Sequence, residues 1–203
     1  MKTSERVSCR DFPCTNVVKD SYILPNVEIE PSKIRAVVVS EAAPSSISDY
    51  YYSVGDPLFQ KTTIQAFHDA GLDVGSIDKL LDSGFYFTTA VKCGKPGYIT
   101  PSEVVKACSY LLEDELGLFP NLSVVMLMGD AAIKAFNEVA RRRTGKRVIP
   151  AGSTYKIRKT PYYYGGIRII PSYLQAGPSY FIEKSKRKMI AEDIREALKI
   201  LGK

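Results

Sequence analysis

The sequence predicts an α/β protein: a three-layer α/β/α sandwich around a central, mainly parallel sheet of four strands. The first observation is that short, β-branched apolar runs alternate along the 203-residue chain with longer segments of helical spacing. This alternation is typical of parallel sheets covered by helices. The second is that the runs are apolar at nearly every position, as in strands buried on both faces. No internal repeat or low-complexity linker interrupts the pattern, so we expect a single domain over residues 1–203.

The expected elements follow from these runs in order. Each strand coincides with one apolar run, at residues 34–40, 85–93, 122–129 and 165–173. Helices are expected where apolar residues follow helical spacing, at about 60–70, 100–116, 130–143 and 183–201. The functional loops of parallel sheets leave the carboxyl ends of the strands. We therefore expect them after Ser40, Cys93, Met128 and Pro171.

The composition favours a protein of the cytoplasm. No stretch approaches the roughly 18 apolar residues of a membrane helix, and the first residues, MKTSERVSCRDF, lack the apolar core of a signal peptide. We expect a cytoplasmic location, no membrane partner and a monomer. In a reducing compartment, four cysteines indicate metal ligands more than disulfides.

Charge is distributed unevenly along the chain. The net charge is +6, but residues 141–203 hold sixteen Lys and Arg against four Asp and Glu, and the other 140 residues carry a balance of −6. The runs RRRTGKR and EKSKRK supply much of the surplus. A one-sided basic surface is typical of proteins that bind polyanions, usually nucleic acids. The alternative is a solvated basic face without a partner.

The four cysteines form one close pair and two distant positions. Cys9 and Cys14 are separated by four residues, whereas Cys93 closes the second expected strand and Cys108 lies on the helix that follows. If that helix packs back over the end of the strand, the thiols of Cys93 and Cys108 come close together, and the N-terminal pair can lie beside them. Four thiolates suit zinc or an iron–sulfur cluster. The alternative is that the cysteines are unrelated, small apolar residues of the core.

The stretch TTAVKCGKPGYITPSEVVKAC, with the N-terminal cysteine pair, resembles the iron–sulfur-containing uracil-DNA glycosylases of the thermophile and archaeal type. That family has two N-terminal cysteines, a third that ends a strand in a motif like TNVVKC, and a fourth on the next helix. The resemblance continues through LEDELGLFPNLSVVMLMGDAAIKAF, IRIIPSYLQAG and SKRKMIAEDI. It implies a uracil-DNA glycosylase-like domain in which residues 1–33 complete a cluster site. It also implies a [4Fe–4S] cluster, in preference to zinc, held by Cys9, Cys14, Cys93 and Cys108.

The same resemblance assigns residues to a base pocket. The family's first loop resembles GE-x-PG, and aligning its proline with Pro44 places Ala42 at the acidic position with Ala43 beside it. A shift by one residue returns Glu41 to the acidic role but misplaces the proline. The resemblance therefore makes Glu41 a candidate catalytic residue and the three residues after it part of the pocket.

Further pocket residues are assigned downstream. Asp49 resembles a later acidic element of the family and is a second catalytic candidate. Leu58 occupies the position of the base-stacking Phe, with Phe59 beside it. Thr89 replaces the Asn that reads uracil, and a Thr hydroxyl cannot present the paired donor and acceptor of an amide. In an active enzyme, one of the two acids would orient the water, and Thr89 with backbone N–H groups would hold the base.

The last loop departs most from the family. Aligning IIPSYLQAG with the family's PTYHP places Leu174 at the histidine and Gln175 at the proline, and the other alignment places Ile170 at the histidine. The single histidine of the chain, His68, lies in an expected helix. Tyr173, Leu174 and Gln175 are nevertheless expected to form the DNA-penetrating loop, where Leu174 would fill the vacated base stack.

Functions of different classes remain open. The first is a DNA N-glycosylase that excises uracil or another damaged base from single- or double-stranded DNA. The second is a catalytically inactive member of the same superfamily that binds DNA, or RNA, because the usual His and Asn positions are replaced. A third is an electron-transfer or redox-sensing protein that uses the cluster itself. This class has the least support, because no sequence feature indicates a surface for a redox partner.

Overall fold

The computed structural model of the protein describes residues 1–97 and 99–203, which form a five-stranded sheet in the order β2-β1-β3-β5-β4. Strands β1, β2, β3 and β5 are parallel, and β4 is antiparallel to β5. The strands are β1 Ala36–Ala43, β2 Phe85–Gly94, β3 Val124–Met128, β4 Tyr162–Tyr164 and β5 Ile167–Ser172. The predicted α/β fold with a mainly parallel sheet is confirmed, with one strand more than expected.

The additional strand, β4, lies at an edge of the sheet and has three residues. It is joined to β5 by a two-residue turn, Gly165-Gly166, whose φ angles of 55° and 84° are both positive. Positive φ at both central residues is the feature of type I′ hairpin turns, and glycine adopts it without strain. Three successive tyrosines lack the alternation that predicts a strand, which explains why the sequence pattern did not reveal it.

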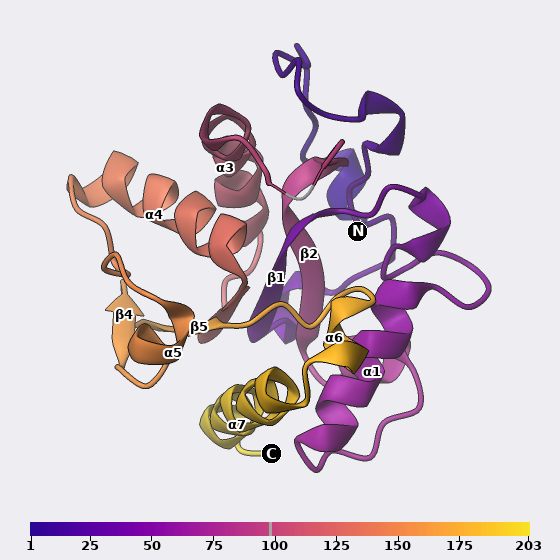
Figure 1. Ribbon diagram of the computed structural model, residues 1–203, viewed down its shortest axis with the longest axis vertical. Coiled ribbons are helices and arrows are strands. Elements are labelled where there is room, and N and C mark those ends of the chain that lie inside the picture. The colour runs from indigo at the N-terminus through magenta and orange to yellow at the C-terminus, as the bar shows by residue number, and fades with distance from the viewer. Residues whose placement is uncertain (98) are drawn as a thin grey trace.

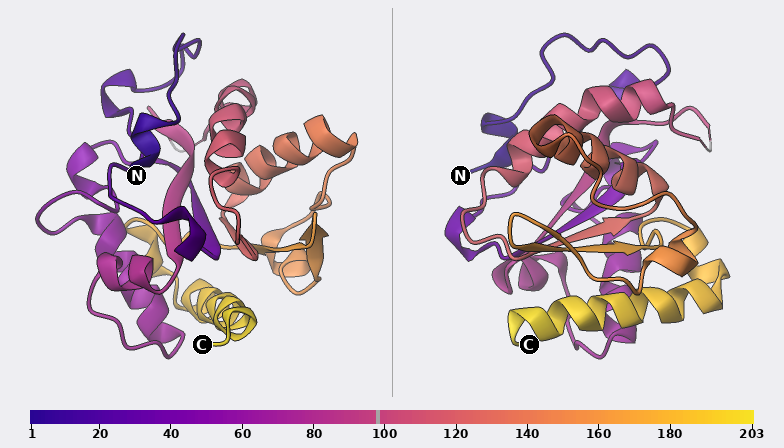
Figure 2. Two further views of the ribbon diagram at one scale, coloured as in Figure 1. Left: turned by 180° about the vertical axis from the view of Figure 1, so that it is seen from behind. Right: turned by 90° about the vertical axis from the view of Figure 1, so that its left-hand side faces the viewer.

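Helices cover both faces of the sheet. α3 (Ser102–Leu116) and α4 (Asp130–Thr144) pack on one face, and α1 (Leu58–Asp69) and α7 (Lys184–Leu201) pack on the other (Figure 1). Figure 2 shows the same three layers from behind and from the side. Shorter helices are α2 Ile77–Asp82, α5 Thr154–Ile157 and α6 Ser179–Ile182. Over the residues described, none of these helices has both the length and the apolar character of a membrane span.

Side-chain alternation along β1 divides the core into two clusters. Ala36 and Val38 pack with residues of α1 and α7, whereas Val37 and Val39 pack with residues of α3 and α4. All four side chains are buried. Burial on both faces explains why the strand is apolar at successive positions, as the sequence pattern predicted.

The N-terminal segment packs against the carboxyl end of β2, which is the other edge strand. The Val18 N–H donates to the Gly94 carbonyl oxygen at 2.8 Å, which forms an isolated bridge with the strand end. The Ser21 hydroxyl donates to the Ser45 carbonyl oxygen, in the loop after β1, at 2.7 Å. These bonds hold the first cysteine pair beside the end of β2 and tie its segment to the loop that follows β1.

Candidate active site and cysteine cavity

A cavity opens at the carboxyl ends of β1, β3 and β5. The chain leaves β1 for β2 on one side and later returns to β3 on the other. Such a reversal leaves a crevice beyond the strand ends, where parallel sheets bind ligands. The cavity has about 570 Å³ of empty space, counting the part open to solvent. Its lining includes Glu41, Gly129, Tyr173, Leu174, Lys186 and Arg187.

Glu41 is the predicted catalytic acid that lies in this crevice. It belongs to β1 itself, and its Oε1 is 3.5 Å from the Ala131 amide nitrogen in the first turn of α4. The Lys95 Nζ lies 3.5 Å from Oε2. Gly129 permits this approach, because a Cβ there would lie 2.6 Å from Oε1. The Glu41 side chain is 21% exposed, so a water or a ligand can reach its carboxylate.

Two other polar side chains considered in the sequence, Asp49 and His68, form hydrogen bonds within the protein. The Leu58 N–H, at the first residue of α1, donates to Asp49 Oδ1 at 3.3 Å. Because the first N–H groups of a helix have no intrahelical partner, Asp49 caps α1. His68 Nε2 lies 2.6 Å from the Val74 carbonyl oxygen. Neither side chain lines the crevice, so the structure brings Glu41, and not Asp49, to the strand ends.

Four residues assigned to the base pocket belong to the end of β1, the loop that follows it and β2, and the other two, Leu58 and Phe59, belong to α1; none of them lines the crevice. Ala42 and Ala43 end β1, and both they and Pro44 are buried. Thr89 lies in β2, where its hydroxyl is buried without a hydrogen-bond partner among the residues described. Leaving a buried hydroxyl unpaired is unfavourable by about 1–3 kcal/mol. The Thr89 hydroxyl therefore suits a hydrogen bond to a water or a ligand.

Aromatic side chains fill space between α1 and the sheet. Phe59, beside Leu58 in the first turn of α1, packs against Tyr51 with ring centroids 5.3 Å apart. Tyr51 is fully buried, and its hydroxyl hydrogen-bonds with Ser40 and accepts from Gln175 Nε2 at 3.1 Å. Burial raises the pKa of Tyr51 above its usual value, so the hydroxyl stays protonated. Sequence reasoning missed this hydrogen-bonded group because no local pattern links its members.

The three residues expected to contact DNA from the last loop differ in exposure: Gln175 is buried, whereas Tyr173 and Leu174 are partly exposed. Gln175 is 1% exposed and bonds within the protein. Its amide pairs with buried hydroxyls in this structure, and its expected contact with DNA stays a prediction. Leu174 and Tyr173 are half-buried against the core cluster on the face of the sheet that α1 and α7 cover. The Lys186 Nζ is 5.4 Å from the Tyr173 ring centroid. Both residues line the crevice.

The four cysteines line one cavity at the end of β2. It has about 280 Å³ of empty space, counting the part open to solvent, and Tyr22 also borders it. All four cysteines are free thiols: Cys93 and Cys108 are buried, and Cys9 and Cys14 are half-buried. The fold thus brings together three separate parts of the chain, namely the N-terminal segment, the end of β2 and α3.

The cysteine thiols affect one another electrostatically. Burial, followed by the charges of Cys108, Cys9 and Cys14, raises the pKa of Cys93 to about 11. Burial also raises the pKa of Cys14 and of Cys108. A metal must therefore displace protons from these thiols. Among the residues described, no group of three or more Cys, His, Asp or Glu side chains is arranged to hold a metal ion, and the sulfurs border a cavity instead.

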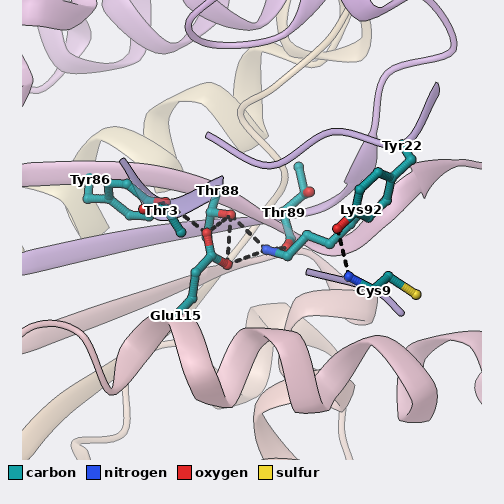
Figure 3. A network of polar contacts seen from close by, with 8 residues as sticks. All are labelled: Thr3, Cys9, Tyr22, Tyr86, Thr88, Thr89, Lys92 and Glu115. Atoms are coloured by element: carbon teal, nitrogen blue, oxygen red, sulfur yellow. Dashed lines mark hydrogen bonds and ion pairs between the residues drawn. The ribbon is translucent and has the colours of Figure 1, made fainter. Parts of the chain in front are cut away.

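A buried ion pair lies beside the cysteine cavity (Figure 3). Lys92 of β2 and Glu115 of α3, 0% and 1% exposed, pair across the two elements. The Lys92 ammonium also donates to Thr88 Oγ1 at 2.8 Å and to the Thr89 carbonyl oxygen at 2.6 Å. The Tyr86 hydroxyl donates to Glu115 Oε1 at 2.8 Å. Buried charges are tolerated when such hydrogen bonds satisfy them. The one sequence signal for the pair is a lysine that is the single charged residue of its strand.

Part of the basic run at the end of α4 is neutralised within the protein. Arg142 and Arg143 each pair with Glu113 at 2.6 Å. In contrast, Lys184 and Lys188 of α7 form no ion pair within the described part of the chain. The cations free to meet a polyanion are therefore found on α7 more than in the RRR run.

The protein thus has an α/β fold with a crevice at the carboxyl edge of its sheet. Residues 28–199 match the uracil DNA glycosylase superfamily. The chain therefore belongs to this superfamily, which confirms the resemblance at that level.

One curated relative agrees with this assignment in sequence. The chain is 28% identical over 139 residues to the type-5 uracil-DNA glycosylase of Thermus thermophilus. That match covers 66% of this chain and 61% of the relative, so the chain spans about three fifths of the relative's length. Among solved structures, the wild-type UNG of Nitratifractor salsuginis has 11% sequence identity and a TM-score of 0.40, over 81% of this chain and 74% of that chain.

Proposed function

We propose that the protein binds DNA and hydrolyses the N-glycosidic bond of uracil or another damaged base. The observation that carries this proposal is the position of Glu41, a partly exposed carboxylate in the crevice at the strand ends. Membership of the superfamily, and a relative named a uracil-DNA glycosylase, support the same reaction. Enzymes that act on a base take it out of the stack and hold it in a pocket, and the crevice supplies such a space.

The residues of the crevice match what the reaction needs. Cleavage of the glycosidic bond leaves an anionic base and a cation-like sugar, so a carboxylate can both accept a proton from water and stabilise the sugar's charge. Contacts with Ala131 and Lys95 orient the Glu41 carboxylate in the free protein. Tyr173 lines the crevice and offers a ring on which a base can stack. The unpartnered Thr89 hydroxyl, in β2 and outside the crevice lining, would hydrogen-bond to a base that extends from the crevice toward β2.

The test is base release by the purified protein from single- and double-stranded oligonucleotides that contain uracil or another deaminated base. Glu41→Gln keeps the size of the side chain and removes the proton acceptor, so we expect release to fall at least about a hundredfold while DNA binding persists. The control is Asp73→Asn, which removes a fully exposed carboxylate. Equal activity of Glu41→Gln and the unmodified protein would exclude this role for Glu41.

We also propose that the four cysteines bind a [4Fe–4S] cluster, in preference to zinc. Four thiols around one cavity provide the ligand set of such a cluster. When bound, the cluster would act as a structural cross-link between the N-terminal segment, β2 and α3. Two contacts connect this region to the crevice: the Ser21 hydroxyl with the Ser45 carbonyl oxygen, and Lys95 with Glu41.

Anaerobic purification with iron, sulfide and zinc analysis tests the cluster. We expect a visible sulfur-to-iron charge-transfer band, and we expect Cys93→Ser to lose it together with part of the thermal stability. A colourless, folded protein with zinc or no metal would exclude the cluster and leave the proposal for Glu41 standing.

A catalytically inactive nucleic-acid-binding protein is the second candidate. Two observations favour it: the single histidine, His68, bonds to the Val74 carbonyl oxygen outside the crevice, and Thr89 stands where the resemblance places an Asn. This candidate predicts DNA or RNA binding that weakens steeply with salt, because bound phosphates release counterions, without release of any base. The oligonucleotide assay above therefore separates the two candidates.

A further inference from the structure

A third cavity adjoins the crevice and lies between α4, residues 147–152 and α5. It has about 870 Å³ of empty space, counting the part open to solvent. Asp130, the first residue of α4, and Thr154, the first residue of α5, line both this α4–α5 cavity and the crevice. A ligand that extends from the crevice past these two residues therefore enters the α4–α5 cavity.

Asn137 of α4 fixes one wall of the α4–α5 cavity. The side chain is buried, and its Oδ1 accepts hydrogen bonds from the Val148 and Ile149 N–H groups, both at 3.0 Å. Its Nδ2 donates to the Ile149 carbonyl oxygen at 2.9 Å. Buried polar groups that are satisfied in this way hold a segment in one arrangement. The chain that lines the cavity after α4 is therefore tied to that helix.

Arg158 fixes the opposite wall. It follows α5 directly and is 2% exposed. Its guanidinium forms a bidentate pair with Asp193 of α7, at 2.6 and 3.0 Å, and also donates to the Met189 carbonyl oxygen at 2.6 Å. Bidentate pairs fix orientation as well as position, so α5 and its Thr154 are held against α7. Both walls are thus formed in the free protein, as in most ligand sites.

Apolar groups from all three segments contribute to the lining of the α4–α5 cavity. They are Ile133, Ile149, Pro150, Ala151 and Ile157. Nucleobases bind between apolar side chains through their flat faces. The cavity therefore suits the faces of a base that is no longer stacked on its neighbours.

One unpaired cation borders the same cavity. Lys134 pairs with Asp130, and Arg141 pairs with Glu138. Arg147 is exposed, and it forms no ion pair within the part of the chain that the structure describes. A guanidinium presents several donors in a geometry that matches a phosphate. Apolar groups and one free guanidinium together complement a single nucleotide.

We propose that the α4–α5 cavity holds a second, unpaired nucleotide of the strand that carries the target base, with Arg147 at its phosphate. The inference rests on the proposed function, in that the crevice holds a base of DNA. The occupant is a linked nucleotide because neighbours in a strand are covalently joined and the two spaces meet at Thr154. A base enters the cavity only when it is unpaired, so the favoured substrate is single-stranded DNA. A duplex would use the crevice alone.

The experiment removes single bases from the DNA. The probe is a fluorescein-labelled single strand with uracil at its centre. In four further strands, one of the two nucleotides on either side of the uracil lacks its base but keeps its sugar and phosphate. Affinities for these strands and for the intact duplex are measured by fluorescence anisotropy, so no readout needs bond cleavage.

The protein variants block the cavity or remove its free charge. Ala151→Glu adds a carboxylate at an exposed position of the lining. Its matched control, Gly75→Glu, adds the same group where a Cβ meets nothing within 4 Å, before α2 and the amino end of β2. Arg147→Gln is compared with Lys79→Gln, which removes an exposed cation of α2.

We expect one flanking position at which loss of the base weakens binding by the unmodified protein at least about fivefold, because a bound base removes apolar area from water. Ala151→Glu should lose this sensitivity and leave duplex affinity within about twofold, whereas Gly75→Glu keeps the sensitivity. Arg147→Gln should lower the slope of log affinity against log salt on the single strand by about 0.7 relative to Lys79→Gln.

Three results would overturn the inference: insensitivity of the unmodified protein at all four flanking positions, unchanged sensitivity in Ala151→Glu, or tighter binding of the duplex than of the single strand. Failure of the proposed function gives a different result. Absence of base release with the sensitivity intact would contradict the glycosylase proposal alone, whereas base release without the sensitivity would contradict the second nucleotide site alone.

Discussion

At the scale of single residues, Gly129 sets how closely Glu41 can approach α4. Its φ of 103° lies in a region that is almost exclusive to glycine, and an added Cβ would meet Glu41 Oε1 at 2.6 Å. We predict that Gly129→Ala lowers the free energy of unfolding by about 1–3 kcal/mol. Because the carboxylate must also move, base release should fall by more than about tenfold. Urea unfolding and the oligonucleotide assay measure the two effects.

Gly145→Ala is the matched control for this prediction. Gly145 also has a positive φ, of 73°, at the end of α4, but an added Cβ there meets nothing within 4 Å. It should lower the free energy of unfolding by roughly 1 kcal/mol and leave base release unchanged. If both variants lose activity in proportion to stability, Gly129 has no special relation to Glu41.

Individual site residues were predictable to different degrees. The cysteines were predictable as a set because few residue types act as soft metal ligands, and the fold brings all four to one cavity. Glu41 and Asp49 could not be ranked from the sequence, because a capping carboxylate and a catalytic one have the same local pattern. The burial of Gln175 was not predictable, since its partners Ser40 and Tyr51 are distant in sequence.

At the scale of elements, the Lys92–Glu115 pair joins β2 to α3 next to the cysteines. Removing one partner leaves a buried charge without compensation, which is unfavourable by about 3–5 kcal/mol. We predict this loss for Glu115→Ala in chemical denaturation. Glu30→Ala, which removes an exposed ion pair with Lys33, should change stability far less.

A compensated replacement distinguishes lost pairing from general damage to the core. The double variant Lys92→Met/Glu115→Leu removes both charges, so it should recover most of the stability that Glu115→Ala loses. A double variant as unstable as Glu115→Ala would show that packing and the Thr88 and Tyr86 hydrogen bonds, and not the unpaired charge, dominate at this position.

An ion pair between α1 and α7 makes the free energy of unfolding depend on pH in the acidic range. Burial opposes ionisation of Asp69, but hydrogen bonds from Tyr180, Gln65 and Arg187 outweigh it and hold the pKa of this carboxyl below its usual value. A carboxyl whose pKa is lower in the folded state than in the unfolded state stabilises the folded protein above about pH 4. This contribution is lost as the pH falls through the folded-state pKa.

We therefore predict that Asp69→Asn lowers stability at neutral pH and flattens its decline below about pH 4. Thermal unfolding across that range, compared with Asp73→Asn, measures the effect. Parallel acid profiles of Asp69→Asn and the unmodified protein would mean that this carboxyl does not couple to folding.

Helices and strands were predictable wherever burial imposes a periodic pattern. The four parallel strands were found because both faces are buried, and α7 because its apolar stripe packs on β5 and α1. The short strand β4 and helices α2, α5 and α6 were not predicted, since elements of three to six residues contain less than two full periods. Their positions depend on tertiary contacts.

At the scale of the whole molecule, the surplus of basic residues in the last third does not form one uniform binding surface. Arg142 and Arg143 pair internally, whereas Lys184 and Lys188 do not. We predict that Lys184→Gln/Lys188→Gln weakens DNA binding and lowers the slope of log affinity against log salt by about 2. Arg142→Gln/Arg143→Gln removes the same charge and should change that slope little. Equal slopes for the two double variants would contradict this assignment of the DNA-binding face.

The most direct test of the account is a crystal structure of the protein bound to a duplex that carries a non-cleavable uracil nucleotide. We predict a base turned out of the stack into the crevice, within hydrogen-bonding reach of the Glu41 region. A duplex bound on another face, with its bases fully stacked, would contradict the claim that the carboxyl edge of the sheet is the site of base excision.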